Sequence, residues 1–109
     1  EIYQSYKKIN ENIISFHKKE LNEILNIYGI FVSTGKWKDY GISNQEEKAV
    51  FFIYKNSSES PIYRIEKKPK LSNKKQLYRV KINNGEIVKK GNDLKNVLKI
   101  FNRNLIKVI

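Results

Sequence analysis

Six consecutive apolar residues, 49–54, constrain the fold of this chain more than any other segment. The run reads AVFFIY and is apolar at both alternating positions, which is typical of a strand that is buried on both faces. A strand of this kind belongs inside a sheet rather than at its edge. We therefore predict that residues 49–54 form a central strand.

Further strands are predicted on the C-terminal side of this run. Two segments alternate between apolar and polar side chains, and Pro69 ends the first of them because proline donates no hydrogen bond to a strand ladder. Asn84-Gly85 is a strong signal for a two-residue hairpin turn. Residues 36–47 are expected to form a loop. The predicted strands are 49–54, 62–67, 77–82 and 86–89, which makes an antiparallel sheet of about four strands.

Two helices are predicted, one before and one after the strands. In residues 17–34 the apolar side chains recur at spacings of three, four and seven, which places them on one face of a helix that Gly35 ends. The second helix is expected over about 92–103, with Asn92 as its N-cap and Asp93 in its first turn. The opposite, polar face of the first helix comprises Lys18, Lys19, Glu20, Glu23 and Asn26.

These elements predict a single α+β domain over residues 1–109, in which residues 1–12 form a frayed or flexible N-terminal extension. Residues 13–16 fit either a short strand or an earlier turn of helix. Residues 105–109 alternate weakly, as an edge strand would. The predicted core combines side chains from both helices and from the strands: Leu21, Leu25, Tyr28, Phe51, Ile53, Ile65, Val80, Leu98 and Phe101.

The residue types present exclude several classes of site. The chain has no cysteine, so disulfides and thiolate metal sites are excluded. His17 is the single histidine, and the carboxylates are dispersed rather than clustered at metal-ligand spacings. No apolar run approaches the roughly 20 residues that span a bilayer, and no secretion signal is recognisable. We therefore expect a cytoplasmic protein that is not an enzyme. It is expected to bind no cofactor, metal or small-molecule substrate and not to associate with a membrane.

The positive charge of the chain is confined to its second half. Residues 1–54 hold as many lysines as acids, whereas residues 55–109 hold fifteen lysines and arginines against four acids and so carry the whole formal charge of +11. Such a segregated field attracts polyanions. The candidate residues for binding nucleic acid are Arg64, Lys67, Lys68, Lys70, Lys74, Lys75, Arg79, Lys81, Lys89 and Lys90.

The alternation of the predicted strands groups some of these cations. It places Arg64, Arg79 and Lys81 on one polar face, beside the lysine-rich connection between the two strands. The alternative is a solvated charged face that only keeps the protein soluble. No aromatic platform for stacking bases is evident, because Tyr63 and Tyr78 point with the apolar residues.

Trp37 is the only tryptophan and lies between two lysines in the segment GKWKDY. A tryptophan in a loop either anchors a partner or closes over the core beneath the loop. Trp37 is therefore a candidate partner contact and, alternatively, a core residue.

Five segments occur in an order that resembles a known family. They are residues 20–29 (ELNEILNIYG), 35–40 (GKWKDY), 49–51 (AVF), 61–71 (PIYRIEKKPKL) and 90–94 (KGNDL). Together they resemble the small alphaproteobacterial family known as domain of unknown function 2794, over roughly residues 16–109. The stretch from Arg64 to Leu71 is the most specific part of the resemblance. The resemblance implies an intracellular bacterial protein, and it implies no activity, cofactor or catalytic residue.

The leading hypothesis from these features is a non-enzymatic basic module that binds DNA or RNA through the positively charged second half. The alternative is a protein-interaction or homodimerisation module whose basic face meets an acidic partner. A salt titration with random DNA and RNA distinguishes the two, because neutralising phosphates makes log affinity fall linearly with log salt.

Overall fold

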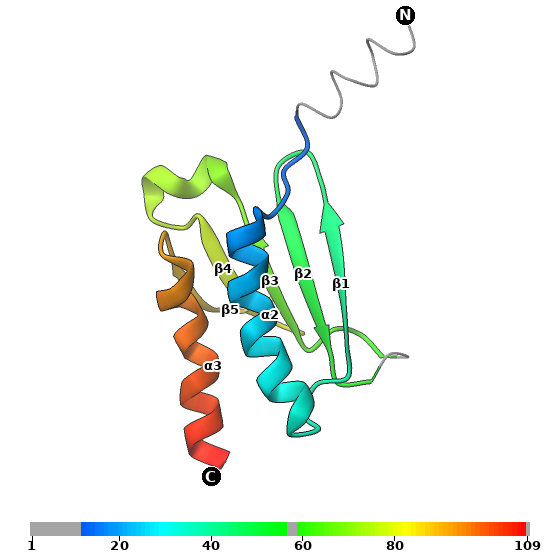
Figure 1. The fold of residues 1–109 in the computed structure, drawn as a ribbon. Coiled ribbons are helices and arrows are strands. Elements are labelled where there is room, and N and C mark those ends of the chain that lie inside the picture. Colours follow the sequence, from blue (N-terminus) through cyan, green and yellow to red (C-terminus); the bar gives the residue numbers. More distant parts are fainter. Residues whose placement is uncertain (1–11, 57–58, 109) are drawn as a thin grey trace, which may run out of the picture.

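The described part of the chain folds into a five-stranded antiparallel sheet with two helices on one of its faces (Figure 1). The computed structural model describes residues 12–56 and 59–108, and side chains up to residue 102. The elements are α2 (Lys18–Ser33), β1 (Asp39–Asn44), β2 (Ala49–Tyr54), β3 (Tyr63–Lys67), the 3₁₀ helix η1 (Pro69–Lys74), β4 (Tyr78–Ile82), β5 (Ile87–Gly91) and α3 (Leu94–Val108). The α+β class and the two flanking helices are therefore confirmed.

The strands follow one another across the sheet in the order β1-β2-β3-β4-β5. The predicted strand 49–54 is found as β2, inside the sheet, although β3 is the central strand. The prediction of about four strands missed β1, which lies within the expected loop 36–47. Strand β1 mixes polar and apolar residues and most of them are exposed, but they pair with β2 along their whole length, from Asp39 opposite Tyr54 to Asn44 opposite Ala49. Pairing with β2 thus stabilises β1 as an edge strand, although the β-propensity of the β1 residues is weak.

The last hairpin and the last helix differ in detail from the prediction. The β4–β5 turn takes three residues, 83–85, with Gly85 at φ +90°, instead of two. Helix α3 begins at Leu94, and Asp93 caps it by accepting a hydrogen bond from the Lys95 amide at 3.2 Å. The expected N-cap, Asn92, instead bonds to the backbone of Leu77 and Ser72 and ties α3 to η1.

The predictions for three segments near the ends of the chain differ in their outcomes. Residues 105–108 continue α3, so the edge strand expected from 105 onward is wrong. Residues 13–16 are neither strand nor helix, and the Ile14 amide bonds to the Gln45 carbonyl at 2.8 Å. Residues 1–11 of the expected flexible extension lie outside the described residues.

Helix α2 ends as its sequence predicts. The amides of Gly35 and Lys36 bond back to the carbonyls of Val32 and Phe31, which is the Schellman arrangement, and Gly35 adopts the positive φ of 77° that this arrangement requires. The helix contributes Ile24 and Phe31 to the core. The remaining predicted core residues of α2, which are Leu21, Leu25 and Tyr28, are half-buried and pack against it.

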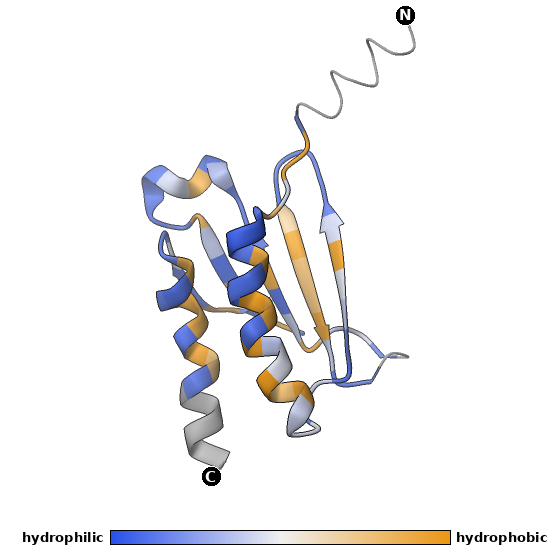
Figure 2. Cartoon of the chain, viewed as in Figure 1, coloured by the Kyte–Doolittle hydropathy of each residue, from blue (hydrophilic) through white to orange (hydrophobic). Residues whose placement is uncertain are grey.

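The core lies between the helices and the sheet. The core residues predicted from the strands and α3 are buried: Phe51, Ile53, Ile65, Val80, Leu98 and Phe101. Figure 2 shows β2 as a nearly continuous hydrophobic strand, whereas β3 and β4 include hydrophilic positions. The alternating side chains of β2 to β4 that do not enter this core point to the opposite side of the sheet. We call that side the open face, because no described helix lies on it.

Candidate nucleic-acid interface

The open face carries apolar and aromatic side chains on β2 and charged side chains on β3 and β4. The strand register places Phe52, Arg64 and Lys81 in one row across the three strands. The adjacent row contains Val50, Glu66 and Arg79, and continues to Lys90 on β5. Residues directly opposite each other on antiparallel strands share a face. The predicted grouping of Arg64, Arg79 and Lys81 is therefore found.

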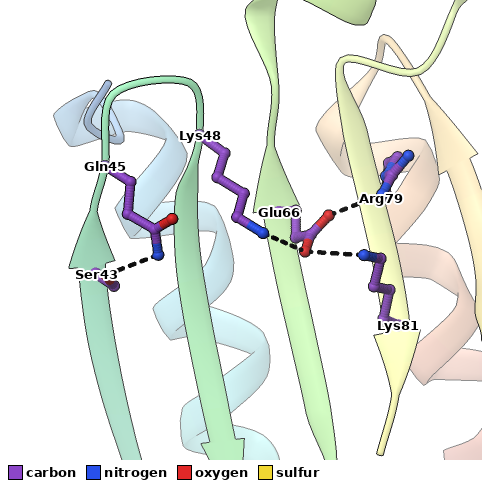
Figure 3. Close-up of polar contacts among 6 residues, drawn as sticks. All are labelled: Ser43, Gln45, Lys48, Glu66, Arg79 and Lys81. Atoms are coloured by element: carbon purple, nitrogen blue, oxygen red, sulfur yellow. Dashed lines mark hydrogen bonds and ion pairs between the residues drawn. The ribbon is translucent and has the colours of Figure 1, made fainter. Parts of the chain in front are cut away.

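Glu66 lies at the centre of a cationic cluster on this face (Figure 3). Its carboxylate contacts Lys48 at 3.5 Å, Arg79 at 3.1 Å and Lys81 at 3.2 Å, and these four residues are called the Glu66 cluster below. The side chain of Glu66 is only 2% exposed, whereas the cations are 14–34% exposed. Three cations thus share one carboxylate and are held in fixed positions, partly open to solvent.

The protonation of Glu66 follows from its surroundings. Burial by itself would raise the pKa of Glu66, but the contacts with Lys81, Lys48 and Arg79 outweigh it and hold that pKa below its usual value. Glu66 is therefore ionised at neutral pH and neutralises one of the three cations. The cluster keeps a net positive charge.

Arg64 is a further cation on the open face, and no acid in the described part of the chain pairs with it. Among the described residues it forms no ion pair and no side-chain hydrogen bond. Its guanidinium carbon lies 5.9 Å from the centre of the Phe52 ring, which is within the range of a cation–π contact. The guanidinium of Arg64 is therefore held next to an aromatic ring, and its hydrogen-bond donors have no partner among the described residues.

Lys67 corrects the predicted set of exposed cations. It lies on the helix-covered side of β3, is 7% exposed, and donates hydrogen bonds to Glu20 Oε1 at 2.9 Å and to the Ser15 carbonyl at 3.0 Å. The hydroxyl of Tyr78 bonds to the other oxygen of Glu20. Glu20, Lys67 and Tyr78 form a buried triad that connects α2 to the sheet. Lys67 is thus a structural residue and not part of the open face.

The triad keeps Glu20 charged inside the fold. Burial would raise the pKa of Glu20, but hydrogen bonds from Tyr78, Lys67 and the His17 amide outweigh it and lower that pKa. The bond from the His17 amide, 2.6 Å long, also caps the start of α2. Burial and the bond to Glu20 raise the pKa of Tyr78, so its phenol stays protonated.

Glu20 was predicted to lie on the polar face of the first helix, although its spacing from the apolar residues already indicated a buried position. Glu20 precedes the buried Ile24 by four residues and the buried Phe31 by eleven, so all three share one stripe of the helix. Because glutamate is charged, position 20 was nevertheless predicted to be exposed. A glutamate on an apolar stripe is the observation that could have predicted a buried partner.

The other predicted cations lie around the open face or at its end. Lys90 is exposed and directly opposite Arg79, while Lys89 is half-buried. Lys68 is half-buried and precedes η1. Lys70 is exposed and pairs with Glu47 at 2.7 Å, and exposed pairs of this kind contribute little to stability. Lys74 and Lys75 are exposed at the end of η1.

Trp37 is a core residue in this structure. It is 4% exposed, stacks on Phe31 with 4.4 Å between ring centres, and meets the edge of Phe101 at 5.2 Å. Trp37 therefore packs into the core beneath its loop, as the second of its two interpretations predicts. Its indole is not available for the partner contact.

Metal-binding clusters and membrane-spanning helices are both absent from the described residues. No three of their His, Cys, Asp and Glu side chains come together in a way that could hold a metal ion. Within the same residues, no helix has both the length and the apolar character required to cross a membrane.

Comparison with known proteins assigns the chain to a family. No curated protein and no solved structure matches it. A family model described as "Protein of unknown function (DUF2794)" matches residues 14–98, which include α2, all five strands, the first residues of α3 and the whole Glu66 cluster. The chain therefore belongs to the DUF2794 family of proteins of unknown function.

Proposed function

We propose that this protein is a non-enzymatic module that binds nucleic acid through the open face of its sheet. The observation that carries the proposal is the charge balance of the two rows, which hold one acid, Glu66, and four cations: Arg64, Arg79, Lys81 and Lys90. Lys48 adds a fifth cation through its contact with Glu66. Solubility alone does not require three cations to converge on one buried carboxylate.

The arrangement of these groups suits phosphate oxygens. Arginine presents planar donors that match phosphate geometry, and lysine acts as a compact point charge. The Glu66 cluster holds three of the cations in place before a ligand arrives, which reduces the entropy lost on binding. Lys90 extends the positive row to β5, so the cations cover three adjacent strands.

Neutralising two cations of the open face should weaken nucleic-acid binding, whereas the same change elsewhere should not. The test variant is Arg64→Gln/Lys90→Gln, because neither residue has an ion pair within the described residues. We expect the slope of log affinity against log salt to fall by roughly 1.4 to 1.8, which corresponds to two lost phosphate contacts. Fluorescence polarisation with random DNA and RNA at several salt concentrations measures this slope.

The matched control is Lys95→Gln/Lys99→Gln, which removes the same charge from exposed positions of α3, on the other side of the sheet. Both double variants should keep the free energy of unfolding within about 0.5 kcal/mol of the original. Equal losses of affinity in the two variants would show that net charge, and not the open face, governs binding. An unchanged affinity in the open-face variant would leave an acidic protein as the alternative partner of this face.

We propose self-association as a second candidate function, on the basis of apolar side chains exposed away from the open face. Tyr40 and Ile42 on the edge strand β1 are 42% and 44% exposed, and Val32 on α2 is 40% exposed. Tyr40 packs against Tyr28, which lies one helical turn before Val32, so these residues line the same edge of the fold. Exposed apolar residues next to a strand edge are suited to contact with a second copy.

Changing Ile42 to lysine should abolish any dimer while leaving the fold intact. A lysine at this exposed position costs little in the monomer but would bury an unpaired charge in an interface. Sedimentation velocity over a range of concentrations measures the change. A protein that is monomeric at all concentrations before the substitution is made would contradict this second function.

A further inference from the structure

The open face separates aromatic from cationic side chains by strand. Phe52 and Tyr54 lie two residues apart on β2, so they share the open face at a spacing of about 7 Å, and both are half-buried with part of their surface accessible. The prediction that no aromatic platform exists considered only Tyr63 and Tyr78. Those two do lie on the helix-covered side, but Phe52 and Tyr54 do not.

The cations form the next columns of the same surface. Arg64 is directly opposite Phe52 on β3, and Lys81 is opposite Arg64 on β4. Because neighbouring strands lie about 4.8 Å apart, the charged groups begin one strand away from the aromatic column. Arg64 joins the two columns, since its guanidinium lies over the Phe52 ring and can extend the stacking surface.

We infer that the open face is specific for single-stranded nucleic acid, with bases over β2 and phosphates over β3 and β4; this inference rests on the proposed function. A single strand presents accessible base faces beside a chain of phosphates, and that pattern matches an aromatic column beside cationic columns. A duplex hides its base faces in the stack and offers only phosphates and groove edges. Arg64 and Lys81 would bind either form, whereas Phe52 and Tyr54 contribute only to the first.

Replacing Phe52 with leucine tests the stacking contribution. Leucine keeps an apolar side chain on β2 but removes the ring, and Phe52→Tyr is the matched control that keeps it. The probes are a fluorescent oligothymidine of about 12 nucleotides, a duplex of the same length, and inorganic polyphosphate, which has no bases. We expect the original protein to prefer the single strand, and Phe52→Leu to weaken that complex about 5- to 100-fold without changing polyphosphate binding. Tyr54→Leu is the second variant, in case Phe52→Leu alters folding, which thermal melts will show.

The possible outcomes separate the inference from the function on which it rests. Duplex binding as tight as single-strand binding, or leucine variants that bind the single strand like the original protein, would overturn the single-strand inference and leave the nucleic-acid proposal in place. Equal weakening of oligothymidine and polyphosphate by Phe52→Leu would also overturn it, because the effect would then act through the cations. The absence of binding to all three probes at low salt would instead refute the proposed function.

Discussion

Replacing Lys67 with methionine should lower the free energy of unfolding by about 3–5 kcal/mol, although the two side chains have similar length. The substitution removes the ammonium group that lies 2.9 Å from Glu20 and leaves a glutamate side chain that is 11% exposed without its counter-ion. It also removes the hydrogen bond to the Ser15 carbonyl, which holds the segment before α2. Urea denaturation at neutral pH measures the change, and a constant m-value will show that the unfolded state is unaffected.

Two further variants show whether this loss comes from the unpaired charge. Lys68→Met changes the neighbouring residue, which takes part in no described ion pair, and should stay within about 0.5 kcal/mol. The triple variant Glu20→Leu/Lys67→Met/Tyr78→Phe replaces the whole triad by apolar groups and should recover most of the lost stability. A loss below about 1 kcal/mol in Lys67→Met would mean that water reaches Glu20 and that the triad is not a buried ion pair.

The case of Lys67 shows why sequence analysis could not locate all of the candidate site. Alternation along β3 puts residues 63, 65 and 67 on the same side, so the pattern alone assigns Lys67 to the helix-covered face. Its charge suggested the surface, because a lysine is almost never buried unless it is paired. The partner, Glu20, lies 47 residues earlier, and no local pattern predicts which helix position meets which strand.

Elements with strong local signals were predictable. Helix α2 follows from apolar spacing and its Gly35 stop, and β2 follows from an uninterrupted apolar run, so both were found within a residue of their predicted bounds. The accessibility of Phe52 was not predicted, because a continuous apolar run indicates a strand that is buried on both faces. Strand β1 was missed because its stability depends on pairing with β2, and that pairing is a tertiary effect.

Changing Glu66 to glutamine should reduce stability and strengthen nucleic-acid binding at the same time. The amide keeps the shape of the side chain but leaves Lys48, Arg79 and Lys81 without their shared counter-ion. We expect a loss of about 3 kcal/mol, at the lower end of the range for a broken buried pair, because the three cations can turn toward solvent. Glu66→Gln removes a negative charge and so frees three cations for phosphates, and this gain should exceed the loss of the preorganisation that Glu66 provides. Affinity for nucleic acid should therefore rise, and its salt dependence should become steeper.

The matched control is Glu86→Gln, which removes the same charge from an exposed position of the β4–β5 hairpin and should change stability by no more than about 0.5 kcal/mol. Acid provides a second control. Because the fold lowers the pKa of Glu66, its stabilisation is complete above the ordinary glutamate value of 4.5 and is lost as the pH falls through the lowered pKa. The difference in unfolding free energy between the original protein and Glu66→Gln should therefore be constant near pH 7 and should shrink below about pH 4.5.

The two measurements on Glu66→Gln together test the proposed role of the open face. If the Glu66 cluster only supports the sheet, stability falls and nucleic-acid affinity rises no more than in Glu86→Gln, which gains the same net charge. If the cluster is a binding surface whose central acid limits its charge, affinity rises further in Glu66→Gln than in that control. A stability difference that persists unchanged in acid would contradict the electrostatic explanation, because Glu66 is then protonated and resembles the amide that replaces it.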